Sequence, residues 1–170
     1  MYAYHFNGYW KDVGTISSLW EANMEVLDPE HSGINLFDNN WKIYSRNSGM
    51  TGHKISASAD VHDSMITDGC RIKGTVKHSV LFAGVKVAEG AVVEDAVVMG
   101  GTTIERGAVV RHCIIAENVT IKENAVVGAM PEGDEHGVAT VGSGITIGEG
   151  AVIGPKAMVR NNVEGGEEQW

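Results

Sequence analysis

Prolines, cysteines and long apolar runs are all scarce in this chain of 170 residues. Two cysteines are too few for a disulfide scaffold, which favours a reducing, cytoplasmic setting. We expect neither a membrane span nor a leader peptide, because no apolar run is long enough and no charged-then-apolar segment opens the sequence. Acidic residues outnumber basic ones, 22 to 13, and the net charge of −9 argues against nucleic acid or an anionic membrane as a partner.

Glycine is abundant instead, and a strict repeat of aliphatic residues accompanies it. The chain has 22 glycines against three prolines, a combination typical of turn-rich β structure. Large aliphatic residues, here called anchors, recur along the chain at successive steps of six, six and five residues. Three anchors therefore make one repeat of 17 residues. The three most regular sets are Leu81, Val87 and Val93; Val98, Ile104 and Val110; and Ile115, Ile121 and Val127.

The residue two positions before each anchor is small or β-branched in nearly every case, as at Ala91, Ala108 and Ala125. Residues two apart on a strand share a face, so each short strand directs one large and one small side chain inward. Cys70 and Cys113 both occupy the small position. We therefore expect two buried, unreactive thiols that act as small apolar side chains.

Three short strands per coil predict an all-β fold, a parallel β-helix shaped as a triangular prism. The pattern resembles that of hexapeptide-repeat proteins, and this resemblance implies a left-handed coil. We expect the β-helix to span residues 55–160. An acidic, turn-rich stretch at 128–137 is expected to protrude as a loop, and residues 161–170 read as a polar tail.

The start of the chain has a different character. Alternation of Tyr2, Tyr4 and Phe6 predicts a short strand, and a helical stripe of apolar residues follows Thr15, a suitable N-cap. The next proline is expected to end this helix at Asp28. A strand and one helix do not make a domain, so this segment reads as the end of something larger.

Between the helix and the repeat, residues 29–54 have no sustained period. They contain a proline, three glycines and paired asparagines, which are typical of a connecting segment. We interpret residues 1–28 as a domain remnant and residues 29–54 as a linker whose apolar side chains pack against a neighbouring surface. The apolar side chains are Ile34, Leu36, Phe37, Trp41 and Ile43.

Three stretches carry a family resemblance. Residues 8–15 (GYWKDVGT) and 18–24 (SLWEANM) resemble the end of the catalytic domain of bacterial glucose-1-phosphate adenylyltransferases. Residues 74–85 (GTVKHSVLFAGV) resemble the first β-helix coils of the same family. The similarity spans most of residues 2–127. On this resemblance the chain is a carboxy-terminal portion: a remnant of an α/β nucleotidyltransferase domain followed by a left-handed β-helix.

The resemblance implies an enzyme that makes ADP-glucose and pyrophosphate from ATP and glucose 1-phosphate, toward glycogen. In that family the aspartate of the Trp-x-Asp-Val-Gly-Thr stretch, here Asp12, helps to hold Mg²⁺, which prefers hard oxygen ligands. The Gly-rich nucleotide loop, a second metal-binding aspartate and the glucose-1-phosphate lysine region are missing. We therefore expect no catalytic residue and no cofactor in this chain alone. If Asp12 does not bind a metal here, we expect it to be a solvated carboxylate near the Thr15 cap.

The same resemblance implies that the β-helix packs on the absent catalytic domain, contributes to tetramer contacts and helps to form sites for sugar-phosphate or nucleotide effectors. Outward apolar residues favour a homo-oligomer assembled through flat faces; they include Val92, Val97, Val109 and Ile114. Basic side chains on the coils are available to an effector phosphate, although most read as solvated charges and no effector residue is assigned. They are Arg71, Lys73, Lys77, Lys86, Arg106 and Arg111.

One further column falls two residues after the third anchor of each coil: Asp63, His78, Asp95 and His112. Such a ladder would stack along one edge. It could bind a metal or respond to pH, because imidazole titrates near neutrality. Cross-coil pairing that avoids like charges is the simpler interpretation, and it is the one we favour.

Other functions are open to this architecture, because one fold serves many chemistries. A trimeric hexapeptide acyltransferase typically uses a histidine near a protruding loop, and His136 lies in such a loop. A hexapeptide carbonic anhydrase needs closely spaced metal histidines, and no His-x₄₋₅-His pair occurs here. A purely structural module is the third alternative.

Overall fold

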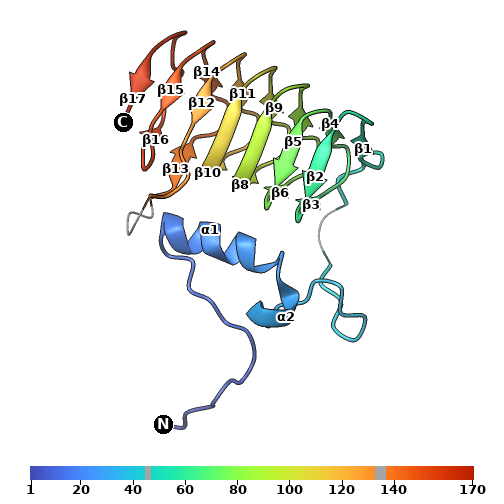
Figure 1. Cartoon of the computed structure of the whole chain (residues 1–170). Helices are drawn as coiled ribbons and strands as arrows, with labels where there is room; N and C mark the ends of the chain where they lie inside the picture. Colours follow the sequence, from blue (N-terminus) through green and yellow to red (C-terminus); the bar gives the residue numbers. More distant parts are fainter. Residues whose placement is uncertain (45–46, 133–136) are drawn as a thin grey trace.

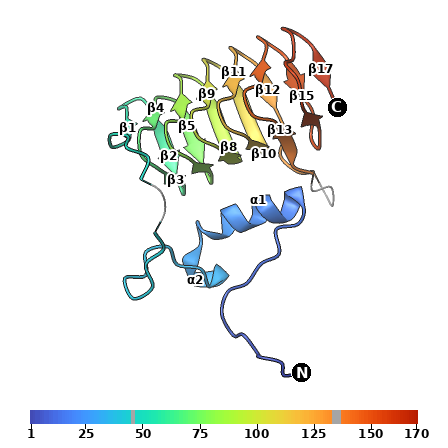
Figure 2. The ribbon, with the colours of Figure 1, turned by 180° about the vertical axis from the view of Figure 1, so that it is seen from behind.

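The computed structural model describes residues 1–44, 47–132 and 137–170. An extended amino-terminal segment leads into two helices, α1 (Ile16–Glu25) and α2 (Pro29–Ser32), and a solenoid of short strands follows. The solenoid has about seven turns. Helix α1 lies along one side of it, while the amino-terminal segment runs away from it (Figures 1 and 2).

The strands form three faces, and parallel pairing runs along each of them. The first face consists of β1 (Lys54–Ile55), β4 (Arg71–Ile72), β7 (Lys86–Val87), β9 (Thr103–Ile104), β11 (Thr120–Ile121) and β14 (Thr146–Ile147). The second consists of β2 (Asp60–His62), β5 (Thr75–Lys77), β12 (Val126–Val127), β15 (Val152–Ile153) and β17 (Glu168–Gln169). The third consists of β3 (Met65–Ile66), β6 (Val80–Leu81), β13 (Ala139–Val141) and β16 (Met158–Val159).

Two long strands, β8 (Val92–Val98) and β10 (Val109–Ile115), bend around the corner between the second and third faces. The first half of β8 pairs with β5 and its second half pairs with β6. These two faces therefore belong to one hydrogen-bonded sheet of 11 strands, while the first face is a separate sheet of six.

The strand register confirms the repeat read from the sequence. Val92 pairs with Val109, and Val109 with Val126, so each partner lies one full repeat further along the chain. Val126 then pairs with Val152. This partner lies nine residues further along than the repeat of 17 predicts, because extra residues interrupt this coil. The interruption falls where the sequence predicts a protruding loop, although residues 133–136 of that loop lie outside the described residues.

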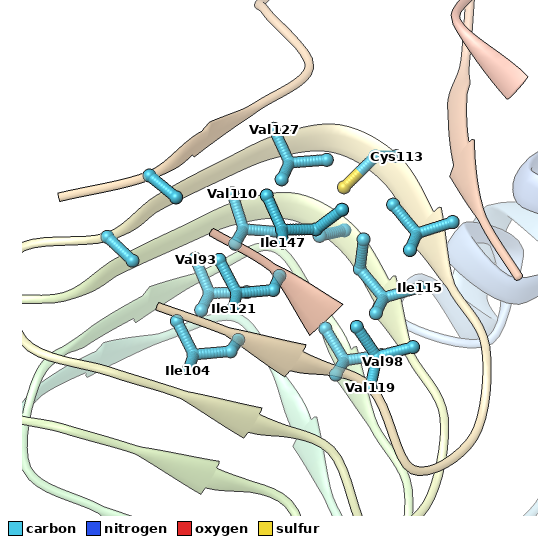
Figure 3. Packing of buried hydrophobic residues seen from close by; sticks show 14 of the residues in the cluster. Val93, Val98, Ile104, Val110, Cys113, Ile115, Val119, Ile121, Val127 and Ile147 are labelled. Atoms are coloured by element: carbon cyan, nitrogen blue, oxygen red, sulfur yellow. The ribbon is translucent and has the colours of Figure 1, made fainter. Parts of the chain in front are cut away.

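The anchors and the small positions fill the interior, as the sequence predicts. Large aliphatic side chains from successive coils stack on one another, as with Ile104 and Ile121 (Figure 3). Cys70 and Cys113 are fully buried free thiols within this core. The burial predicted from the sequence is confirmed, and burial raises the pKa of both thiols, which disfavours the nucleophilic thiolate.

The carboxy-terminal segment differs from the polar tail expected at residues 161–170. Val163 is buried and bridges Ile147 on the first face, and β17 pairs with β15 on the second. This segment is therefore a further coil of the solenoid. Val163 supplies the inward anchor, while the glutamates around it point outward, so a mostly polar composition conceals the repeat.

The amino-terminal segment also differs from expectation. Residues 2–6 form no strand, and Tyr2, Tyr4 and Phe6 are exposed, because the described chain offers them no partner strand. Helix α1 ends at Glu25, three residues before the expected limit. The proline at position 29 instead begins α2, where its missing N–H costs nothing.

In residues 29–44 and 47–53, α2 is followed by irregular backbone that continues to β1. Of the five apolar residues expected to pack, only Ile34 is half-buried. The other four are exposed, so within the described chain they do not pack against a neighbouring surface as the sequence predicts. They are Leu36, Phe37, Trp41 and Ile43.

Candidate functional site at the helix–solenoid junction

Asp12 lies in a turn that leads into α1. Its side chain is exposed, and Oδ1 accepts a hydrogen bond of 3.1 Å from the backbone N–H of Gly14. Thr15 then caps the helix in a reciprocal capping box with Ser18. Asp12 thus shapes the helix entry, and a single carboxylate engaged in this way does not by itself fit a Mg²⁺ site.

A small polar network fixes the segment before α1 against the helix. Lys11 Nζ lies 2.6 Å from Glu25 Oε1 and 2.9 Å from Glu21 Oε2, and Tyr9 donates a 2.6 Å hydrogen bond to Glu25. The hydrogen bond from Lys11 and then that from Tyr9 lower the pKa of Glu25, and the bond to Glu25 raises the pKa of Lys11. Both groups are therefore charged at neutral pH.

Helix α1 covers the third face of the solenoid. Met24 packs in one buried cluster with Val97, Ile114 and Val138, and Trp20 adjoins this cluster. The indole Nε1–H of Trp20 donates a 2.7 Å hydrogen bond to the carbonyl of Asp95, 75 residues away. Two of the outward apolar residues, Val97 and Ile114, are therefore covered by this chain's own helix and are not available to a partner.

The Asp–His column occupies a corner of the prism. Asp63, His78, Asp95 and His112 all have positive φ, between 42° and 51°. Among residues with a side chain, short polar ones such as Asp tolerate this left-handed region best, with His also enriched there. This backbone requirement explains the residue types in the column, and it is a constraint that the count along the sequence does not reveal.

The members of the column do not act as one ladder. His78 Nδ1 lies 2.5 Å from Asp95 Oδ1, a cross-coil pair of the kind the sequence favours. His112 is buried beneath α1, where its ring lies 4.4 Å from the Trp20 ring at a tilt of 56°. Within the described residues, no group of three His, Cys, Asp or Glu side chains is placed to hold a metal ion.

The second face remains uncovered and carries an apolar stripe. Val92, Val109, Val126 and Val152 stand directly opposite one another on four successive coils, and all four are half-buried. The strand alternation turns these valines outward, while their neighbours Val93, Val110 and Val127 fill the core. We define these four outward residues as the valine stripe.

Three of the six basic residues picked out in the sequence pair with a carboxylate. Arg111 lies 3.1 Å from Glu94, Lys77 lies 3.5 Å from Asp60, and Arg106 lies 3.9 Å from Glu89. The Lys77 and Arg106 pairs are exposed and of small energetic value, while Arg111 and Glu94 are both half-buried. Among the residues that the structure describes, the other three have no ion-pair partner: Arg71, Lys73 and Lys86.

The fold and these faces are those of a hexapeptide protein. Residues 49–148 match the family described as GlmU-like, C-terminal hexapeptide, and the chain belongs to that family of left-handed β-helices. Residues 1–29 match the nucleotidyl transferase family. No helix in the described part of the chain has the length and apolar character needed to cross a bilayer.

A glucose-1-phosphate adenylyltransferase from Geobacillus stearothermophilus is 54% identical over 93 residues, which is 55% of this chain and 24% of that enzyme. This chain spans about a quarter of that relative's length and corresponds to its carboxy-terminal portion: the end of the nucleotidyltransferase domain and the hexapeptide domain.

Among solved structures, a variant of perosamine N-acetyltransferase from Caulobacter crescentus, in complex with CoA and GDP-perosamine, resembles 68% of this chain and 51% of its own, with a TM-score of 0.45 and 19% identity. A likeness at this level carries no functional argument. His136, on which the acyltransferase alternative depends, lies outside the described residues.

Proposed function

We propose that this chain is the assembly and regulatory portion of a glucose-1-phosphate adenylyltransferase, and that it does not catalyse the reaction alone. The complete enzyme would form ADP-glucose and pyrophosphate from ATP and glucose 1-phosphate in the cytoplasm, toward glycogen. The observation that carries the proposal is the joining of a nucleotidyltransferase end to a hexapeptide solenoid, similar to the Geobacillus enzyme.

Exposed aromatic residues support an absent neighbouring domain. Tyr2, Tyr4, Trp10, Phe37 and Trp41 are all largely solvent-accessible in this chain. Large exposed apolar side chains that gather on two segments, as here, usually mark a surface that a partner covers. We propose that the preceding part of the nucleotidyltransferase domain covers them, and that it supplies the second aspartate that Asp12 needs to hold Mg²⁺. The free thiols fit a reducing cytoplasm.

The turnover of the isolated chain tests the catalytic half of this proposal. With ATP, glucose 1-phosphate and Mg²⁺, we expect pyrophosphate release at the background rate, because a lone exposed carboxylate cannot position two substrates. A circular dichroism spectrum of β type confirms that the sample is folded. Clear turnover that disappears in Asp12→Asn would show that a complete active site lies within this chain, and the proposal would then be wrong.

The assembly half of the proposal rests on the valine stripe. A flat face of aligned valines lets a second prism pack against it, and burial of such a stripe is favourable by about 25 cal/mol per Å². We expect the chain to self-associate in solution, and the double variant Val109→Glu/Val126→Glu to be monomeric, as measured by light scattering after size-exclusion chromatography. Glutamates on this face would lose hydration and repel one another in any interface.

The matched control is Thr120→Glu/Thr146→Glu. These threonines are also outward, half-buried and directly opposite one another, but they lie on the first face. This variant is expected to keep the mass of the parent chain. Assembly through the valine stripe is excluded if the parent is monomeric at about 100 µM, or if the two double variants behave alike.

A further inference from the structure

Met50 attaches the linker to one corner of the solenoid. Its side chain lies over Gly69 and Gly84, which occupy the same corner on two successive coils. A Cβ atom added to Gly69 would come within 2.5 Å of the Met50 sulfur, and one added to Gly84 within 3.1 Å of the Met50 methyl group. Both glycines have positive φ, 73° and 78°, the left-handed region that favours glycine. The corner is therefore a groove without side chains, and the thioether of Met50 fills it.

Three hydrogen bonds accompany this contact. The Gly69 N–H donates to the Thr51 carbonyl at 2.7 Å. The Ser48 hydroxyl lies 3.5 Å from a carboxylate oxygen of Asp68, and it accepts from the Met50 N–H at 3.3 Å. The two bonds of Ser48 are at the long end of the usual range and contribute little. The packing of Met50 and the bond to Thr51 therefore carry most of the attachment of this part of the linker.

The sulfur that makes this contact is also open to solvent. Met50 is 49% exposed, whereas Met24 beneath α1 is 7% exposed. A peroxide converts such a thioether to a sulfoxide: a lone pair of the sulfur attacks one peroxide oxygen, the O–O bond breaks, and hydrogen peroxide leaves as water. The sulfur is oxidised by two electrons and the peroxide is reduced by two. The reaction requires only that the peroxide reaches the sulfur, which the exposure of Met50 allows.

A sulfoxide does not fit the glycine corner. The sulfur already lies 3.2 Å from the place of a Gly84 Cβ, and oxidation adds an oxygen atom to it. The backbone N–H groups of the corner cannot receive this oxygen, because the Gly69 N–H donates to Thr51 and the Gly84 N–H donates to Asp68. A polar group that is packed without a hydrogen bond is costly, so the oxidised side chain is more stable in water.

We propose that Met50 is a reversible oxidation site, and that its sulfoxide detaches residues 47–51 from the solenoid. This linker joins α1 to β1, so detachment would loosen that connection while Trp20 still holds α1 on the third face. An effect of peroxide on turnover would rest on the proposed function, through the position of the missing domain. Oxidation and detachment are properties of this chain and are measured without that domain.

Treatment of the folded chain with hydrogen peroxide, followed by peptide mass spectrometry, tests the oxidation. We expect Met50 to react at least about tenfold faster than Met24, because the buried sulfur is reached only when α1 opens locally. Hydrogen exchange resolved to single amides then tests the detachment. The Gly69 amide is expected to exchange at least about tenfold faster after oxidation, since its acceptor on Thr51 moves away. The Gly84 amide, bonded within the solenoid, should remain protected.

Met50→Leu separates the sulfur from the packing. Leucine has a similar volume and no sulfur, so peroxide should leave the Gly69 amide of this variant protected. Met158→Leu is the matched control: Met158 is 54% exposed on the third face, and its removal should not alter the response of Gly69. Methionine sulfoxide reductases of both stereospecificities are expected to restore protection in the oxidised parent chain.

Three results would overturn the proposal. Met50 could stay reduced while Met158 is oxidised, the Gly69 amide could stay protected once Met50 is a sulfoxide, or peroxide could expose this amide equally in Met50→Leu. Failure of the reductases to restore protection would overturn the reversibility. Each result is independent of the pyrophosphate assay and of the valine variants, so this proposal and the proposed function can fail separately.

Discussion

Replacing Trp20 with alanine is expected to release α1 from the third face of the solenoid. The change removes the 2.7 Å hydrogen bond to the Asp95 carbonyl and the contact with the His112 ring. It also removes the packing of the indole beside the cluster that contains Val97 and Ile114. Truncation of a packed tryptophan costs about 3–5 kcal/mol. A helix of only ten residues is marginal in water without tertiary contacts, so it should unfold once released.

Hydrogen exchange measured by mass spectrometry checks this expectation. Peptides that cover residues 16–25 should lose most of their protection in Trp20→Ala, while the β-type circular dichroism of the solenoid is retained. Trp10→Ala is the matched control, because Trp10 is 77% exposed and its removal should leave exchange unchanged. If α1 keeps its protection in Trp20→Ala, the remaining apolar contacts are sufficient, and the role given to Trp20 here is wrong.

Replacing Ile104 with alanine is expected to destabilise the solenoid by about 2–5 kcal/mol. Ile104 is fully buried at the centre of the solenoid and stacks on Ile121 (Figure 3). Its neighbour on the other side of the stack is Val87. The interior is a single column of interlocking side chains, so adjacent coils cannot easily move to fill the space left by the missing atoms. Because each coil is stabilised mainly by its neighbours, the loss should spread along the structure.

Urea unfolding followed by far-UV circular dichroism measures this loss, with Thr103→Ala as the control. Thr103 is the adjacent residue of the same strand and points outward, so its truncation should cost less than about 0.5 kcal/mol. A difference of under about 1 kcal/mol between the two variants would mean that the interior relaxes around the cavity. The two substitutions share a strand and a local backbone, which isolates the effect of burial.

The candidate site was only partly accessible to reasoning from the sequence. The Asp–His column follows from counting, and the cross-coil pairing that the sequence favours is observed for His78 and Asp95. The burial of His112 was not foreseeable, because it depends on a helix much earlier in the chain folding back onto that coil. The positive φ angles of the column were equally hidden, since a count of residues contains no backbone geometry.

The basic residues show the same limit. Six of them are visible on the coils in the sequence, but spacing alone does not separate Arg71 and Lys73 from the paired Arg106 and Arg111. Lys54 precedes the first regular anchor and was not picked out at all. Only the lateral pairing of β1 with β4 places it beside Arg71.

What the sequence by itself determined is the solenoid: its period, its inward residues, the burial of both cysteines and the position of the inserted loop. Each strand of the repeat places one large and one small residue inward. Because every coil meets this requirement with its own residues, the pattern can be read from the sequence coil by coil. The tertiary structure alone decided which outward faces are free. Helix α1 covers Val97 and Ile114 but leaves Val109 uncovered, and Val163 extends the solenoid into a segment of polar composition. These outcomes depend on contacts between segments far apart in the chain, which no local pattern records.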